Sequence, residues 1–297
     1  MPVCSGIASQ ELTAKSSWDR VLWRRQPFPD NYVDASFLGQ LRTNTTAQFP
    51  RFLSIALSSM SILQHLCIVL LFVALFVHLY LGTVDASVLV WTSVAVSGLL
   101  ACAGYPFSFN QSIPGILVLS FTLYSLSPVV RTFSEATTSD SVWACAAVLF
   151  CGHLAFADSR MNASCLSQLT STISLNMGMC ASVVLSSRLR LDLDVFALLL
   201  VALQLFAIYP LLRTRIYVRF GSLCTSDGYQ IPCASIPLTI VLLVVSIYAM
   251  LPHSRLVALY LHPILVAFVG ILCPLWMRYT QRWKREMRGP WDEAGVS

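Results

Sequence analysis

The chain has 297 residues, of which 56% are hydrophobic and 11% are charged, and its mean hydropathy is +0.70. An ordinary globular chain carries about 25% charged residues, so this composition excludes a soluble domain and indicates a polytopic membrane protein. The formal net charge of +5 is modest and its basic residues lie near the ends of apolar segments, so we expect no nucleic-acid partner.

The first 51 residues form a polar segment without the apolar core of a cleavable signal peptide. A short amphipathic helix is expected around Trp18, at the membrane interface. Two prolines then predict an extended stretch, and a second short helix is expected from Asp34. The segment is either an interfacial anchor or a docking surface for another subunit. Its candidate contact residues are Trp18, Pro27, Pro29, Asp30, Asn31 and Tyr32.

Eight apolar segments predict an all-α transmembrane bundle over residues 52–277. A helix needs about 20 apolar residues to cross the roughly 30 Å hydrocarbon core of a bilayer. Between Arg51 and Arg131 the chain has no Lys or Arg and one acidic residue, Asp85, so this stretch has the character of such helices. The expected helices cover residues 53–81, 84–104, 113–130, 140–157, 165–187, 192–212, 234–251 and 256–277.

The fifth of these segments is the least apolar, but its small residues follow a regular pattern. Thr170, Ser174, Gly178, Ser182 and Ser186 recur at every fourth position and therefore share one face of a helix. Small residues let a neighbouring helix approach closely within a membrane. The pattern predicts a helix in the interior of the bundle, with an interfacial or re-entrant segment as the alternative.

Ionisable residues inside the apolar segments are few, and such residues are candidates for function. Asp140 is expected to cap the fourth helix, whereas His153 and Asp158 lie on one helix but not on one face. The sequence contains no HExxH motif, no paired inward carboxylates and no nucleotide-binding loop. We therefore expect no catalytic site, metal or cofactor in this chain, with an intramembrane enzyme using His153 and Asp158 as an alternative.

Three arginines, Arg213, Arg215 and Arg219, lie at the end of the sixth expected helix. Guanidinium groups suit phosphate, so these residues are predicted to bind a lipid headgroup. The simpler interpretation is that they only contribute to the excess of positive charge on the cytosolic side. With eight spans, 15 of the 19 Lys and Arg fall on the side of both termini, which predicts that both termini are cytosolic.

The C-terminal tail, residues 278–297, begins with basic residues and ends with acidic ones. A Gly-Pro pair ends the last helix, and a tryptophan beside two acidic residues follows it. Because tryptophan is unfavourable in water, we expect this motif to pack on a partner or on cytosolic loops. Its candidate contact residues are Gly289, Pro290, Trp291, Asp292 and Glu293.

Motifs along almost the whole chain carry a resemblance to a known family. They are WDRVLWRRQPFPDNYVDASFL at 18–38, SPVVRTFSEATTSDSVWA at 127–144, GHLAFAD at 152–158, the stretch from SLNMGMCASVVLSSRL to YPLLR at 174–213, and KREMRGPWDEA at 284–294. With these motifs in this order, the chain resembles the PIG-C family of membrane subunits of phosphatidylinositol N-acetylglucosaminyltransferase.

The resemblance implies a role in the first step of glycosylphosphatidylinositol (GPI) anchor synthesis, the transfer of GlcNAc from UDP-GlcNAc to phosphatidylinositol. It implies a non-catalytic subunit, since the family assigns the transfer to a separate glycosyltransferase subunit, PIG-A. The implied partners are a PIG-A-like subunit, other subunits of the complex and phosphatidylinositol, in the endoplasmic reticulum membrane. From the residues alone, a lipid transporter or scramblase is the alternative, because small-residue stripes and basic rims would suit a headgroup groove.

Overall fold

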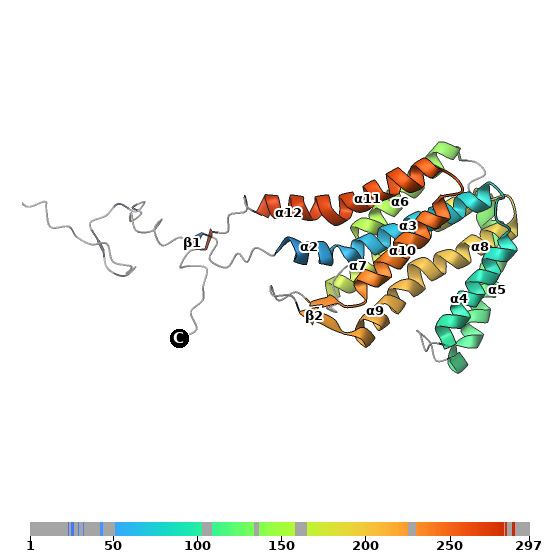
Figure 1. The fold of residues 1–297 in the computed structure, drawn as a ribbon, viewed down its shortest axis with the longest axis horizontal. Helices are drawn as coiled ribbons and strands as arrows, with labels where there is room; N and C mark the ends of the chain where they lie inside the picture. The colour runs from blue at the N-terminus through green and yellow to red at the C-terminus, as the bar shows by residue number, and fades with distance from the viewer. Residues whose placement is uncertain are drawn as a thin grey trace, which may run out of the picture. The chain divides into compact units, whose positions relative to one another are not determined.

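The computed structural model describes residues 23, 25–26, 29, 32, 42–43, 51–102, 109–133, 137–157, 165–224, 230–281, 283 and 287–288. The chain divides into two units, which are described separately. One unit comprises residues 49–281, and the other comprises residues 1–48 together with 282–297. The larger unit is a bundle of helices, which Figure 1 traces from blue to red.

Each of the eight apolar segments contains helix. The elements are α2 (Phe52–Ser58), α3 (Met60–Tyr80), α4 (Ala86–Cys102), α5 (Phe109–Phe133), α6 (Ser139–Ala155), α7 (Cys165–Ser186), α8 (Asp192–Ala202), α9 (Tyr209–Phe220), α10 (Ser235–Met250), α11 (His262–Ala267) and α12 (Cys273–Gln281). Three π-helical stretches continue them, η1 (Leu203–Ile208), η2 (Val257–Leu261) and η3 (Phe268–Leu272). Strands β2 (Ser222–Cys224) and β3 (Gln230–Pro232) form an antiparallel pair.

Four stretches among the described residues are long and apolar enough to cross a membrane: Phe52–Tyr80, Leu169–Ser186, Asp192–Phe220 and Val257–Gln281. The apolar helices Ala86–Leu99, Ser139–Ala155 and Ser235–Met250 are shorter. A helix of 16 or 17 residues, such as α10 or α6, rises about 25 Å, which is less than the hydrocarbon thickness. The structure therefore supports a membrane bundle with four candidate spans, and the expected number of eight is not confirmed.

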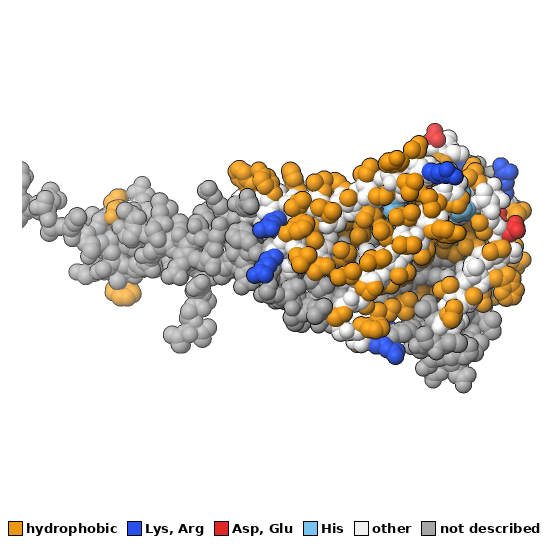
Figure 2. Space-filling model, viewed as in Figure 1, with side chains coloured by type: hydrophobic (Ala, Val, Ile, Leu, Met, Phe, Trp, Pro, Cys, Tyr) orange, Lys and Arg blue, Asp and Glu red, His pale blue; other side chains and the backbone are white. Residues whose placement is uncertain are grey.

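The outer surface of the bundle has the character expected of a surface in lipid. On the face shown in Figure 2, hydrophobic side chains cover the helices between their ends, and charged side chains lie toward the ends. Large apolar residues such as Phe121, Val148 and Val244 are exposed on different helices. Contiguous apolar surface of this extent would favour aggregation in water, whereas hydrocarbon accommodates it.

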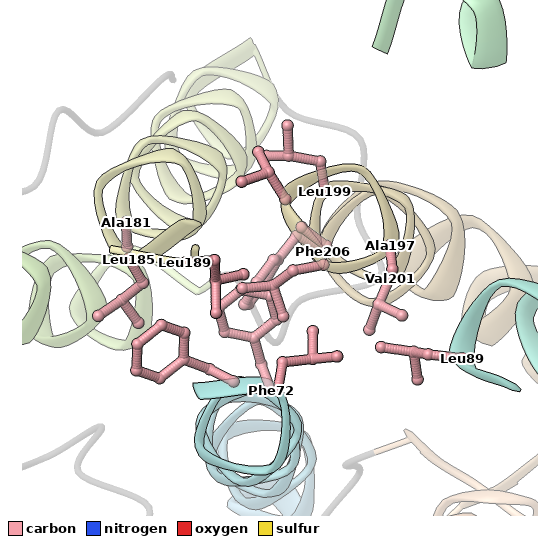
Figure 3. Packing of buried hydrophobic residues seen from close by; sticks show 14 of the residues in the cluster. Phe72, Leu89, Ala181, Leu185, Leu189, Ala197, Leu199, Val201 and Phe206 are labelled. Atoms are coloured by element: carbon pink, nitrogen blue, oxygen red, sulfur yellow. The ribbon is translucent and has the colours of Figure 1, made fainter. Parts of the chain in front are cut away.

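Helix α3 forms the centre of the bundle. The most apolar part of the stretch that contains it is 61% buried, against 33% for the stretch that contains α7. Phe72 of α3 is fully buried and meets Phe150 and Phe206 edge to face, with ring centroids 5.9 and 5.4 Å apart. Figure 3 shows Phe72 and Phe206 among aliphatic side chains from the neighbouring helices.

The prediction for the fifth segment is right about the packing face and wrong about the position. In α7, Ser174, Gly178, Ser182 and Ser186 are buried, so the small-residue face packs against the bundle as expected. The opposite face of α7 is exposed, so the helix lies at the periphery and not in the interior. Small residues at every fourth position predict that one face of a helix is packed. They do not show whether the opposite face is also covered by other helices.

Asp140 does not cap the fourth predicted helix. The residue before α6 is Thr138, whose extended backbone (φ −69°, ψ 148°) makes it the N-terminal flanking residue, and Asp140 lies in the first turn of the helix. A carboxylate in the first turn still interacts favourably with the positive end of the helix dipole. The alternative partner of His153, Asp158, lies outside the described residues.

In the smaller unit, the chain before the first helix pairs with the chain after the last one. Strand β1 (Arg42–Thr43) is antiparallel to β4 (Met287–Arg288), with Arg42 opposite Arg288. The Tyr32 amide donates a hydrogen bond of 2.9 Å to the Pro29 carbonyl oxygen. Most of the stretch that we expected to be extended lies outside the described residues. The expected helices at Trp18 and Asp34 lie outside the described residues.

The close approach at Gly178 generates a prediction. A Cβ atom added there would lie 2.9 Å from Phe206 Cδ1 and 3.2 Å from His153 Nδ1, and both rings are buried. Gly178→Ala should therefore destabilise the protein by about 1–3 kcal/mol, measured by thermal unfolding in detergent. Gly98 of α4 has nothing within 4 Å of the same position, so Gly98→Ala is the control. Equal melting temperatures for the two variants would contradict this packing.

Candidate functional site

Polar side chains gather inside one end of the bundle, where α3 and α10 begin and α9 ends. Helices α3 and α10 are close neighbours, and both bring the polar residues of their first two turns to this end. We call this cluster the polar layer. Its members are Ser61, Gln64, His65, His153, Ser174, Tyr209, Arg213, Tyr217, Ser235 and Thr239.

Gln64 is the centre of the polar layer and is completely buried. Its Nε2 atom donates to the Ser235 carbonyl oxygen at 3.2 Å and to Thr239 Oγ1 at 2.9 Å. Its Oε1 atom accepts from the hydroxyls of Tyr209 at 3.0 Å and Tyr217 at 3.1 Å. Both donor hydrogens and both acceptor positions of the amide are therefore occupied by protein groups, which ties α3 to α9 and α10.

Arg213 enters the same layer from α9 and is only 8% exposed. Its Nη1 atom donates to Ser61 Oγ at 2.6 Å and lies 3.3 Å from His65 Nε2. Because a guanidinium can only donate, His65 accepts at Nε2 in this contact. The guanidinium carbon also lies 5.9 Å from the centre of the Tyr217 ring, within the range of a cation–π contact. Arg213 thus joins α9 to α3.

The structure separates the three arginines that the sequence groups together. Successive residues of a helix are about 100° apart, so Arg215 and Arg219 share a face that Arg213 does not. Arg213 is buried, whereas Arg215 and Arg219 are exposed at the end of α9. A phosphate that bound Arg215 and Arg219 would lie on the outside of α9. Headgroup binding by these residues stays a prediction.

His153, the other polar residue that the sequence singled out, joins α6 to α7. The buried ring directs Nδ1 to the Ser174 carbonyl oxygen at 2.8 Å, and Ser174 Oγ donates to the His153 carbonyl oxygen at 2.9 Å. The ring centre is 5.3 Å from that of His65 and 5.1 Å from that of Phe206. This arrangement brings His153 to the edge of the polar layer.

The sequence analysis did not identify Gln64, Tyr209 or Tyr217 as members of a site, although the sequence contains a signal for each of them. Gln64 is an amide inside the most apolar stretch of the chain, and such residues usually face the interior of a bundle. Tyr209, Arg213 and Tyr217 follow one another at intervals of four, so they lie on one helical face. A search for polar residues at helical spacing within apolar segments would have found the layer.

A second set of polar contacts joins the chain segments at the opposite end of the bundle. His78 contacts Thr83 Oγ1 at 2.7 Å and the Ala249 carbonyl oxygen at 2.9 Å, and the His253 ring centre lies 3.9 Å from that of His78. Desolvation, followed by the nearby His78, lowers the pKa of His253 below its usual value. Arg131 pairs with Asp192 at 3.2 Å. Within the described residues, no group of three His, Cys, Asp or Glu is placed to hold a metal.

Comparisons with known proteins match nearly the whole chain. The family model described as GPI2, phosphatidylinositol N-acetylglucosaminyltransferase, matches residues 18–292. The chain is 32% identical to the PIG-C subunits of phosphatidylinositol N-acetylglucosaminyltransferase from Bos taurus and Homo sapiens, over 96% of this chain and 94% of each relative. It is 31% identical to the GPI2 subunit of the same enzyme from Schizosaccharomyces pombe, over 94% of this chain and 87% of the relative. No solved structure matches it.

The polar layer generates a prediction about stability. Gln64→Met keeps the volume of the side chain but leaves the hydroxyls of Tyr209 and Tyr217 without their acceptor, so it should destabilise the protein by about 1–3 kcal/mol. Thermal unfolding in detergent measures this change, with Tyr248→Phe on the exposed face of α10 as the control. In a background with phenylalanine at 209 and 217 the cost of Gln64→Met should fall, whereas additive effects would contradict the network.

Proposed function

Because this chain belongs to the GPI2 family, we propose that it is a membrane subunit of phosphatidylinositol N-acetylglucosaminyltransferase. This complex transfers GlcNAc from UDP-GlcNAc to phosphatidylinositol, the first step of GPI-anchor synthesis. The observation that carries the proposal is the extent of the match, which includes the bundle and most of both terminal segments. A match of this extent favours the role of the whole relative over the reuse of a single motif. The lipid transporter or scramblase has no support in the comparisons.

The proposed role is non-catalytic, with transfer carried out by a separate subunit of the PIG-A type. The contacts of the polar layer support this role, because they join helices of the bundle to one another. The Gln64 amide has its hydrogen-bonding capacity filled by α9 and α10, and Ser174 and His153 bond to each other. Hydrogen bonds of this kind between helices stabilise one arrangement of the bundle. The bundle thereby provides a rigid frame for other subunits.

We place the protein in the endoplasmic reticulum membrane with eight spans and both termini in the cytosol. The pairing of β1 with β4 supports an even number of spans, because paired strands lie on the same side of a membrane. The four candidate spans, the three shorter apolar helices and the 25-residue helix α5 together provide eight. The excess of Lys and Arg on this side supports the cytosolic assignment.

For the mechanism, we propose that the bundle holds the lipid acceptor beside the catalytic subunit. The acceptor lies in the membrane and the nucleotide sugar is soluble, so the reaction needs a surface that fixes the height and angle of the headgroup. Arg215 and Arg219 have exposed side chains near the end of α9. Their guanidinium groups suit the phosphate of phosphatidylinositol.

Purification of the tagged protein in a mild detergent tests the assignment. A glycosyltransferase should co-elute, and the eluate should form GlcNAc-phosphatidylinositol from UDP-GlcNAc and phosphatidylinositol. Recovery of the protein alone, under conditions that preserve other membrane complexes, would contradict membership of the complex.

The two exposed arginines generate a prediction about the rate of product formation. Replacing both, Arg215→Gln with Arg219→Gln, should lower the rate about tenfold or more at limiting phosphatidylinositol, because charge-assisted contacts to phosphate are lost. Recovery of the complex should not change. Arg278→Gln, which removes an exposed arginine from α12, is the matched control. An unchanged rate in the double variant would contradict headgroup binding. The two arginines would then only contribute to the excess of positive charge on the cytosolic side.

The terminal segments generate a prediction about assembly. Deleting residues 289–297 should lower the recovery of the glycosyltransferase severalfold, because the deletion removes Trp291 and the two acids beside it. Deleting only residues 295–297 keeps this motif and is the control. Quantitative immunoblotting of the purified material measures the ratio of the two proteins. If the ratio of glycosyltransferase to this protein is the same for both deletions, the motif does not bind the glycosyltransferase and makes contacts only within this chain.

A further inference from the structure

Asn176 places an amide on the outer face of α7, far from either end of a candidate membrane span. The span covers Leu169–Ser186, so Asn176 lies seven residues after its first residue and ten before its last. At 1.5 Å per residue, the amide lies roughly 10 Å or more from both ends. The side chain is exposed, and in a membrane that this span crosses it would lie at the depth of the hydrocarbon.

The other described amides that lie away from the ends of candidate spans have partners on neighbouring helices. Gln64 is fully bonded within the polar layer, and Gln204 donates to the Ser93 carbonyl oxygen and to Ser97 Oγ, both at 2.8 Å. Several exposed threonine hydroxyls bond to their own helix, as Thr122 does to the Leu119 carbonyl oxygen at 2.8 Å. Of these three amides, only Asn176 has no hydrogen bond to any residue that the structure describes.

An unpaired amide in hydrocarbon is unfavourable, because lipid tails offer neither a donor nor an acceptor. A carboxamide can donate twice and accept twice, so its complement is a group that also does both, such as another amide or a hydroxyl. Phosphate headgroups lie at the surface of the bilayer and do not reach this depth. The complementary group must therefore come from a protein segment inside the membrane.

The residues beside Asn176 form a surface on which a helix can pack. Leu169, Ile173 and Cys180 lie three to seven residues away at helical spacing, and all three are exposed. The opposite face of α7 already packs against the bundle through Ser174 and Gly178. We call Leu169, Ile173, Asn176 and Cys180 the Asn176 face.

We propose that the Asn176 face binds a membrane-spanning helix of another subunit, through a side chain that both donates to and accepts from the Asn176 amide. The inference rests on the proposed function, which supplies a complex in which such a subunit exists. The complementarity is specific: a partner helix with only apolar residues at this depth would leave the amide unpaired. The bundle thus meets its partner through one hydrogen-bonded contact surrounded by aliphatic packing.

Asn176→Leu in the tagged full-length protein tests the contact. Interhelical hydrogen bonds of this kind correspond to about a three- to thirtyfold change in an association constant, so retention of the partner should fall by that factor. The thermal stability of the isolated protein should not fall, since the amide has no hydrogen bond to lose within the chain. Thr122→Val, which removes an exposed hydroxyl bonded to its own helix, should retain the partner fully. Full retention by Asn176→Leu would overturn the proposal.

A photo-crosslinking amino acid identifies the occupant. With p-benzoylphenylalanine in place of Ile173, irradiation of the intact complex should join this chain to another subunit. The same substitution at Val244, exposed on α10, is the control for non-specific capture. Adducts of the chain with itself would overturn the proposal in favour of a self-association surface. The absence of any protein adduct at position 173 would overturn it in favour of a lipid-facing surface.

These results are distinguishable from failure of the proposed function. If the chain is not a subunit of the transferase, the wild-type protein recovers no glycosyltransferase and forms no GlcNAc-phosphatidylinositol. If only the Asn176 contact is wrong, the wild type and Asn176→Leu recover the same subunits and form product at the same rate.

Discussion

Hydrocarbon offers no hydrogen bonds, and the arrangement of this bundle depends on that constraint. Two amides inside the bundle bind their helices to others: Gln64 fixes α3 against α9 and α10, and Gln204 fixes the stretch after α8 against α4. Apolar packing in a membrane has little power to select one arrangement, because a leucine is as well solvated by lipid as by protein. The aromatic contacts of Phe72 fill the centre, but the polar contacts determine which helices lie next to it.

The same constraint explains why a membrane bundle would retain polar residues in its interior. Arg213 and His65 occupy positions where a hydrophobic pair would be easier to desolvate. Their benefit is specificity of packing, since a rotation of α9 would separate Arg213 from Ser61 and His65 of α3. The proposed role as a frame for other subunits would need this uniqueness more than additional stability.

Sequence patterns predicted the helices well and the helix surroundings less well. The period of apolar residues and the absence of charge located all eight helical segments, because these signals are local. They did not identify α3 as the centre, since burial in a bundle depends on neighbours that lie far away in sequence. The candidate site was partly visible: Arg213 and His153 stood out as ionisable residues, whereas Gln64 is uncharged and was passed over. Arg213 lies on a different face from Arg215 and Arg219 because the helix continues to Phe220. The sequence had predicted that it ends at residue 212.

The pairing of β1 with β4 has a consequence for the order in which the protein matures. Strand β4 follows the last helix, so β1 must wait until every helix of the bundle has left the ribosome before it meets its partner. Closing so long a loop is slow and entropically unfavourable unless the intervening helices are already inserted and assembled. The strand pair therefore forms only on a finished bundle. A partner that recognised the joined strands would engage complete molecules and pass over those still being translated.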